Sequence, residues 1–179
     1  MKEALLVGNG PSILDKPLGS VIDAFPGEVV RFNEFILEPA EYTGTRTDVW
    51  VIAHRSHSIE NMHPDLVSRI AQVPRRVQYR NRRRRFRSTG IAAMFWYLRE
   101  GYEVVLYGFD HFALDRRKNY YDHDKGNMLC REYVAGKPYH DKDKEMVEEA
   151  IKAGRPVSYL HERLNDYILH SEPREAETP

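Results

Sequence analysis

Residues 4–12 have the sequence ALLVGNGPS, in which a short apolar run ends directly in a turn with two glycines. An apolar run of this length, bounded by glycine and proline, indicates a buried β-strand followed by a tight turn. Glycines allow a backbone to approach a ligand closely, and Asn9 and Ser12 offer hydrogen bonds. The third glycine of the dinucleotide fingerprint and the Lys-Ser/Thr pair of a P-loop are both missing. An ordinary turn is the alternative interpretation of this stretch.

The rest of the chain alternates between strand and helix patterns. Strands are expected at residues 28–32, 48–53, 75–80, 103–107 and 156–160, and helices at residues 17–25, 64–70, 88–101 and 141–151. This β-α-β alternation predicts an α/β domain, built on a mostly parallel sheet with helices on both faces. We expect a single domain over residues 1–170 and a flexible tail over residues 171–179.

Three polar segments fall where expected strands end. They are Gly8–Ser12, Arg31–Asn33 and Gly108–His111. Ligands of parallel α/β sheets bind beyond the carboxyl ends of the strands. The sequence therefore predicts that these segments converge on one ligand site.

Composition excludes some classes of protein. The 179 residues contain 27 Lys and Arg against 27 Asp and Glu, so net charge indicates no particular partner. No apolar run approaches the roughly 20 residues that span a bilayer, and the first residues lack the apolar region of a signal peptide. A single cysteine, Cys130, excludes an internal disulfide and a cysteine-based zinc cluster. We expect a cytoplasmic location, and peripheral attachment to the inner membrane is left open.

Residues at the starts of two expected helices are candidates for anion binding and for general-base catalysis. Ser88-Thr89-Gly90 opens the helix at 88–101, and helix N-termini bind anions through free N–H groups. Simple capping by Ser88 is the alternative. His140 is expected just before a helix capped by Asp141, where a histidine tends to stay neutral and suits a general base. An exposed loop histidine is the alternative there.

Residues 75–87 contain eight arginines together with Tyr79 and Phe86. Such a segment can bind nucleic acid, an acidic or phosphorylated sugar acceptor, or an anionic membrane. A solvated loop is again the alternative. Our candidates for binding an acceptor or another anion are Arg83, Arg85 and Arg87.

Metal ligands are not indicated. Asp122-His123-Asp124 has the Asp-x-Asp pattern of metal-dependent glycosyltransferases, but it falls in the aperiodic polar segment 109–139, and three-residue matches are common by chance. The histidines at 54, 57 and 63 lack a recognised set of partner ligands. We expect neither a metal nor a cofactor.

Taken together, these segments resemble the sialyltransferases, both the animal-type glycosyltransferase family 29 and, more loosely, the bacterial family 42. Residues 6–12, 19–23, 30–33 and 42–48 are similar to the large sialylmotif, and residues 88–109 to the small one. Residues 140–145 match the very small motif, His-x4-Glu. The motifs keep the family's order and spacing over most of the chain. The lone Cys130 differs from the animal enzymes, which join their large and small motifs by a disulfide.

The resemblance implies a variant Rossmann-like (GT-A-like) fold that binds a CMP-activated acidic sugar, CMP-sialic acid or CMP-Kdo, as its donor substrate. It also implies transfer to a glycan or glycolipid acceptor with inversion, as in lipopolysaccharide or capsule biosynthesis. In this pattern His140 is the general base and Glu145 orients the site. The donor-binding residues that the resemblance implies are Gly8, Asn9, Gly10, Ser12, Asn33, Ser88, Thr89, Gly90, Gly108, Phe109, Asp110, Tyr120 and Tyr121.

Two other interpretations stay open from the sequence alone. One is an inactive sialyltransferase-like protein that binds a cytidine nucleotide. The other is a nucleic-acid-binding module built on Arg75–Arg87, although we expect no obligatory nucleic-acid partner. A homo-oligomer is also left open.

Overall fold

A computed structural model of the chain describes residues 2–33, 35, 37, 39–53, 75–79, 88–110 and 139–171. Its described strands form one six-stranded sheet in the order β4-β3-β2-β1-β5-β6, and each neighbouring pair is parallel. The strands are β1 (Lys2–Val7), β2 (Glu28–Phe32), β3 (Val49–Ala53), β4 (Arg75–Tyr79), β5 (Tyr102–Tyr107) and β6 (Val157–Tyr159). The predicted parallel α/β sheet is confirmed.

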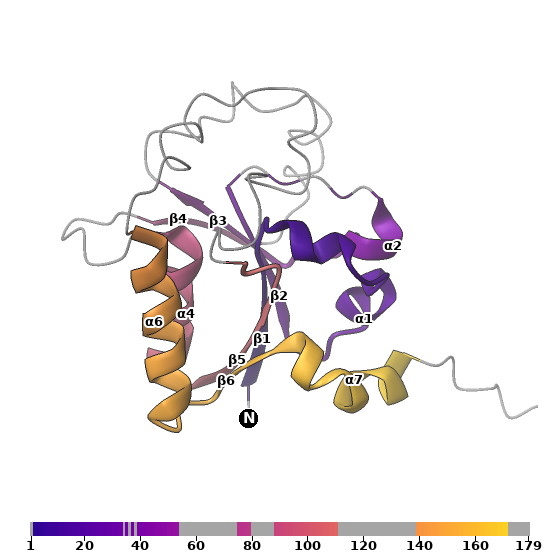
Figure 1. Cartoon of the computed structure of the whole chain (residues 1–179). Helices are drawn as coiled ribbons and strands as arrows, with labels where there is room; N and C mark the ends of the chain where they lie inside the picture. Colours follow the sequence, from indigo (N-terminus) through magenta and orange to yellow (C-terminus); the bar gives the residue numbers. More distant parts are fainter. Residues whose placement is uncertain are drawn as a thin grey trace, which may run out of the picture.

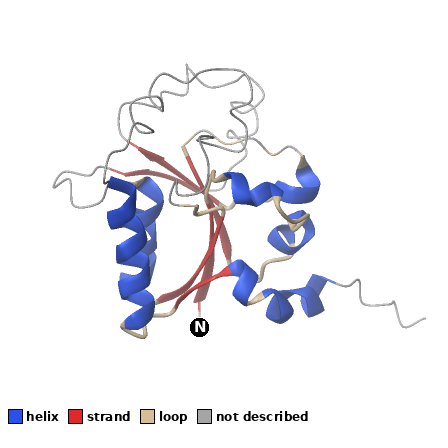
Figure 2. Ribbon diagram, in the orientation of Figure 1, coloured by secondary structure: helices blue, strands red, loops and turns tan. Residues whose placement is uncertain are grey.

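Helices cover both faces of this sheet (Figures 1 and 2). They are η1 (Pro11–Leu14), α1 (Gly19–Asp23), α2 (Ala40–Thr43), α4 (Thr89–Arg99), α6 (Tyr139–Lys152), η3 (Leu160–Glu162) and α7 (Leu164–Ser171). The helices α4 and α6 pack on one face, whereas η1, α1 and α7 pack on the other. None of the helices in these described stretches is long and apolar enough to cross a membrane.

The apolar run of β1 is explained by its central position. Its residues alternate between the two faces, so that Ala4 and Leu6 join the core beneath α4 and α6. Leu5 and Val7 join the core beneath η1, α1 and α7. Because both faces are covered, every residue from Ala4 to Val7 is buried and the strand is apolar throughout.

The direction in which successive strands are added to the sheet reverses beside β1. From β1 the chain moves outward through β2 and β3 to β4, and then returns to add β5 and β6 on the other side of β1. Ligands of open parallel sheets bind at such a point of reversal, beyond the carboxyl ends of the two strands. Here those ends are followed by Gly8 and Gly108.

Two expected boundaries are wrong. Helix α6 begins at Tyr139, so that His140 lies inside the helix and Asp141 belongs to its first turn. Aspartate is favoured both as an N-cap and in the first turn, so the sequence pattern could not separate the two positions. Ser171, which we expected to begin the tail, ends α7. The helix expected at 64–70 lies outside the described residues.

The helix α7 was not expected, and long-range polar contacts hold it in place. Arg163, just before α7, pairs with Glu103 on β5 and, at 3.5 Å, with Glu3 on β1. The hydroxyl of Tyr167 donates to Glu3 at 3.2 Å. Since Glu3 and Glu103 lie opposite each other on neighbouring strands, Arg163 neutralises two adjacent carboxylates.

Candidate functional site

The turns that follow β1 and β5 are bonded to each other at the carboxyl edge of the sheet. The Gly8 N–H donates to the Tyr107 carbonyl at 2.7 Å, and the Gly10 N–H donates to the Gly108 carbonyl at 2.9 Å. A Cβ on Gly8 would lie 2.4 Å from the Gly108 carbonyl oxygen, so only glycine fits there. Gly108 itself has a φ of 68°, which also favours glycine. The two glycine turns that the sequence predicted to converge do so through their backbones.

Ser12 and Asp110 are paired with each other. The Asp110 carboxylate accepts hydrogen bonds from the Ser12 N–H at 2.8 Å and from the Ser12 hydroxyl. Because the two residues are 98 positions apart in the chain, this pair locks η1 onto the turn after β5. Their predicted contact with a donor stays a prediction, and their described contacts build the edge of the site.

The two candidate asparagines lie at the ends of β1 and β2. The side-chain amide of Asn9 donates to the Phe32 carbonyl at 3.2 Å, which ties the first turn to the end of β2. Asn33 has a φ of 50°, a left-handed conformation that asparagine tolerates better than most residues. Its carbonyl accepts from the indole N–H of Trp50 at 2.7 Å. Backbone strain of this kind is concentrated at functional sites.

The N-terminus of α4 lies beside the same turns. Ser88 caps the helix, because its hydroxyl accepts from the Ile91 N–H at 3.2 Å. A Cβ on Gly90 would lie 2.6 Å from the Phe109 ring, and the same ring would lie 3.0 Å from a Cβ on Gly8. Phe109 therefore fills the space between the first turn and the start of α4, with its ring edge-to-face with Phe32 at 6.0 Å.

Helix α6 contacts the start of α4 through a residue that was not on our candidate list. The Asp143 carboxylate is buried and accepts from the Ser88 N–H at 3.0 Å. His140 precedes Asp143 by three residues on α6, so this bond brings the helix of the expected base to the expected anion-binding turn. Glu145, predicted to orient the site, is exposed on α6.

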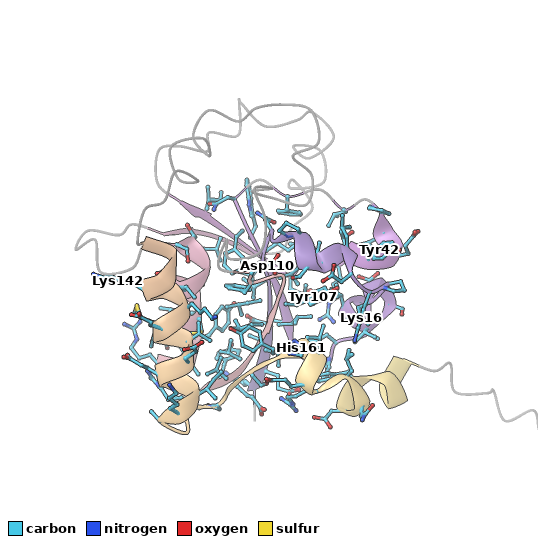
Figure 3. All side chains as sticks on the ribbon, in the orientation of Figure 1. Lys16, Tyr42, Tyr107, Asp110, Lys142 and His161 are labelled. Carbon is cyan, nitrogen blue, oxygen red and sulfur yellow. The ribbon has the colours of Figure 1, made fainter. Side chains whose placement is uncertain are left out.

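Tyr107 supports the first turn from below. Its hydroxyl donates to the Ile13 carbonyl at 2.9 Å and to the Lys16 carbonyl at 3.3 Å. Burial, together with the charges of Asp15 and Asp110, raises the pKa of Tyr107 well above its ordinary value. The phenol therefore keeps its proton and remains a donor to η1. Figure 3 labels Tyr107 between Asp110 and Lys16 in the view shown.

Other candidates lie outside the described residues. They are Arg83, Arg85, Arg87, Tyr120 and Tyr121, together with the Asp-x-Asp segment at 122–124. Within the described part of the chain, no group of three or more His, Cys, Asp or Glu residues is arranged to hold a metal ion.

The sequence contained a signal for Asp143 that our reasoning missed. Asp143, Val147 and Ala150 are spaced four and three residues apart, which places them on one face of a helix. Val147 and Ala150 pack into the core, so the aspartate occupies the next position of a buried stripe. Tyr107 gave no comparable signal, because a tyrosine that ends an apolar strand reads as ordinary core.

The chain resembles two solved structures over most of its length. The first is the sialyltransferase CstII from Campylobacter jejuni in complex with the substrate analogue CMP-3FNeuAc: the TM-score is 0.57 at 16% sequence identity, over 89% of this chain and 81% of that chain. The second is a mammalian sialyltransferase in complex with Gal-beta-1-3GalNAc-ortho-nitrophenol: the TM-score is 0.51 at 14% identity, over 88% of this chain and 68% of that chain.

No protein-family model and no curated protein matches the sequence. The similarity to these structures is therefore a similarity of fold, which the sequence comparisons do not detect. It confirms the expected resemblance at the level of the fold: this chain has the fold of the solved sialyltransferases.

Proposed function

We propose that this protein is a glycosyltransferase that transfers an acidic sugar from a CMP-activated donor, CMP-sialic acid or CMP-Kdo, to a glycan or glycolipid acceptor. One observation carries the proposal. The turns after β1 and β5 meet the start of α4 at the point where the strand order reverses, in a sheet with the fold of solved sialyltransferases. The three segments joined there are those whose sequences resemble the donor-binding sialylmotifs.

The donor would lie across this junction. The bonded turns of Gly8–Ser12 and Gly108–Asp110 would receive the cytidine monophosphate. The N–H groups and hydroxyls at the start of α4, with Asn9 and Asn33 opposite, would meet the phosphate and the sugar carboxylate. Hydrogen-bond donors that the fold holds in place stabilise negative charge without reorganising during the reaction.

The chemistry then needs a base for the acceptor. His140 would take the proton of the acceptor hydroxyl while that oxygen forms its bond to the anomeric carbon. The bond from the anomeric carbon to the phosphate oxygen breaks, and CMP leaves with the electron pair. A single direct displacement of this kind inverts the anomeric centre. Its transition state resembles an oxocarbenium ion, because the anomeric carbon is tertiary.

CMP should raise the melting temperature more than AMP, GMP or UMP does. A ligand at 100 times its dissociation constant stabilises the native state by about 2.7 kcal/mol. For a domain of this size, that corresponds to roughly 5–10 °C in melting temperature. Differential scanning fluorimetry with the four nucleotides at equal concentration makes the comparison. Equal shifts for all four nucleotides would reject the cytidine assignment. Equal shifts that also fall steeply as the salt concentration rises would favour a nucleic-acid-binding module.

Chelation should leave transfer largely intact. The leaving group is a monophosphate, which develops less charge than a diphosphate, and the start of α4 supplies N–H donors for it. Activity measured after EDTA treatment should therefore stay within about threefold of the untreated rate, a smaller change than loss of a metal catalyst causes. Abolished turnover that magnesium or manganese restores would instead assign Asp122 and Asp124 as metal ligands.

A further inference from the structure

Asp143 occupies a place on α6 where an apolar side chain would be expected. It is 3% exposed, and it continues the buried stripe of Val147 and Ala150. One carboxylate oxygen accepts from the Ser88 N–H, but the other, Oδ1, is buried without a hydrogen-bond partner in the described structure. A buried carboxylate satisfied on one side only lowers stability relative to an apolar residue. Its presence there points to a role other than stability.

The bond from Asp143 fixes Ser88 from outside its own helix. Ser88 caps α4 with its hydroxyl, while its N–H is held by Asp143, 55 residues later in the chain. The carboxylate also lies at the positive end of the α4 dipole, where a charge-assisted hydrogen bond is favourable. The orientation of Thr89 and Gly90, which follow Ser88, is thereby tied to α6.

The bond from the Ser88 N–H to Asp143 also joins the first half of α6 to the start of α4. Among residues 142–146, Asp143 is the buried one: Lys142, Lys144 and Glu145 are exposed, and Met146 is half-buried. The next buried residue, Val147, comes a full turn later. The contact between Asp143 and Ser88 therefore anchors the described part of α6 that directly follows His140.

We propose that Asp143 is a positioning residue, which holds the first turn of α6 and its histidine at a fixed distance from the turn Ser88–Gly90. This inference rests on the proposed function, since it assigns Asp143 a role in that reaction. In this role Asp143 acts through His140 and Ser88 and contacts neither the sugar donor nor the acceptor. A displacement of about 1 Å between reacting groups costs up to about 10²-fold in rate.

The test compares Asp143→Ala with Asp143→Asn in the full chain. Alanine removes the acceptor for the Ser88 N–H, whereas the asparagine side chain keeps an amide oxygen that can accept it. For Asp143→Ala we expect kcat to fall about 10- to 100-fold, with the Kd of CMP changed less than about threefold. Asp143→Asn should restore kcat to within about threefold of wild type. Glu149→Ala, which removes an exposed carboxylate from the same helix, is the matched control and should leave kcat unchanged.

The outcomes separate this inference from the proposed function. Wild-type kcat in Asp143→Ala would overturn the positioning role while leaving the transferase proposal intact. An equal loss in Asp143→Ala and Asp143→Asn would also overturn it, because the charge and not the hydrogen bond would then matter. Absence of turnover in the wild-type protein would overturn both. If Asp143→Ala fails to fold, Asp143→Val, which has no acceptor and suits the buried position, takes its place, with the same expected separation of kcat from CMP affinity.

Discussion

His140→Ala should lower kcat about 10²- to 10⁴-fold, the range typical for the loss of acid–base catalysis. His140 is the second residue of α6, and the positive end of a helix dipole disfavours the protonated imidazolium. A histidine with an ordinary pKa of about 6.5 is therefore available as a neutral base near pH 7. The acid limb of the rate–pH profile should follow the protonation of this histidine, which removes the base. Steady-state kinetics of the wild-type chain and of His140→Ala as a function of pH measures both effects, because the acid limb should be lost in the variant.

The controls for this variant follow from the same geometry. CMP affinity should change little in His140→Ala, because the base acts on the acceptor and not on the nucleotide. Glu145→Gln should cost less than His140→Ala, since Glu145 is exposed on the helix. His111 and His123 are the competing bases, and each requires the same substitution. Near-normal turnover in His140→Ala, or loss of turnover in His111→Ala alone, would reassign the base.

Gly8→Ala should abolish measurable CMP binding. The new Cβ would lie 2.4 Å from the Gly108 carbonyl oxygen and 3.0 Å from the Phe109 ring, and the first of these atoms is backbone that cannot rotate away. The two bonded turns must separate to relieve the contact, which breaks the hydrogen bond from Gly10 to Gly108. We expect a fall in CMP affinity of more than about 10²-fold and a loss of stability of about 1–3 kcal/mol, as for other overpacked sites. Isothermal titration and urea unfolding measure the two quantities.

Gly101→Asn is the matched control for Gly8→Ala. Gly101 follows α4 in open space, and its φ of 80° is a conformation that asparagine tolerates. Its substitution should leave CMP affinity unchanged. If Gly8→Ala bound CMP as tightly as the wild-type chain does, the bonded turns after β1 and β5 would not form the nucleotide site.

The sequence predicted the parts of the fold that depend on local pattern. Apolar runs bounded by glycine marked β1 and β5, and the cap at Ser88 marked the start of α4. These features follow from burial and capping, which neighbouring residues determine. The convergence of the turns at Gly8 and Gly108 also followed, because parallel strands end at one edge.

What the sequence did not predict depends on distant contacts. The helix α7 is only eight residues long, and Arg163 before it pairs with carboxylates on β1 and β5, which the local sequence does not reveal. The reversal of strand order between β1 and β5 is a property of the assembled sheet. Asp143 was missed because an aspartate is usually a surface residue; its spacing from Val147 and Ala150 places it on their buried face, but its contact with Ser88 depends on the assembled fold.

The proposed function requires the protein to release CMP from a CMP-linked acidic sugar and to transfer the sugar to an acceptor. Release of CMP from CMP-sialic acid and from CMP-Kdo, followed by anion-exchange chromatography with and without a mixture of glycan acceptors, tests it most directly. We predict that the protein releases CMP from at least one of the two donors faster than the uncatalysed rate, that acceptors increase the release, and that His140→Ala suppresses it. UDP-linked neutral sugars should not be consumed. Failure to release CMP from either donor, or equal consumption of UDP-linked sugars, would contradict the proposed function.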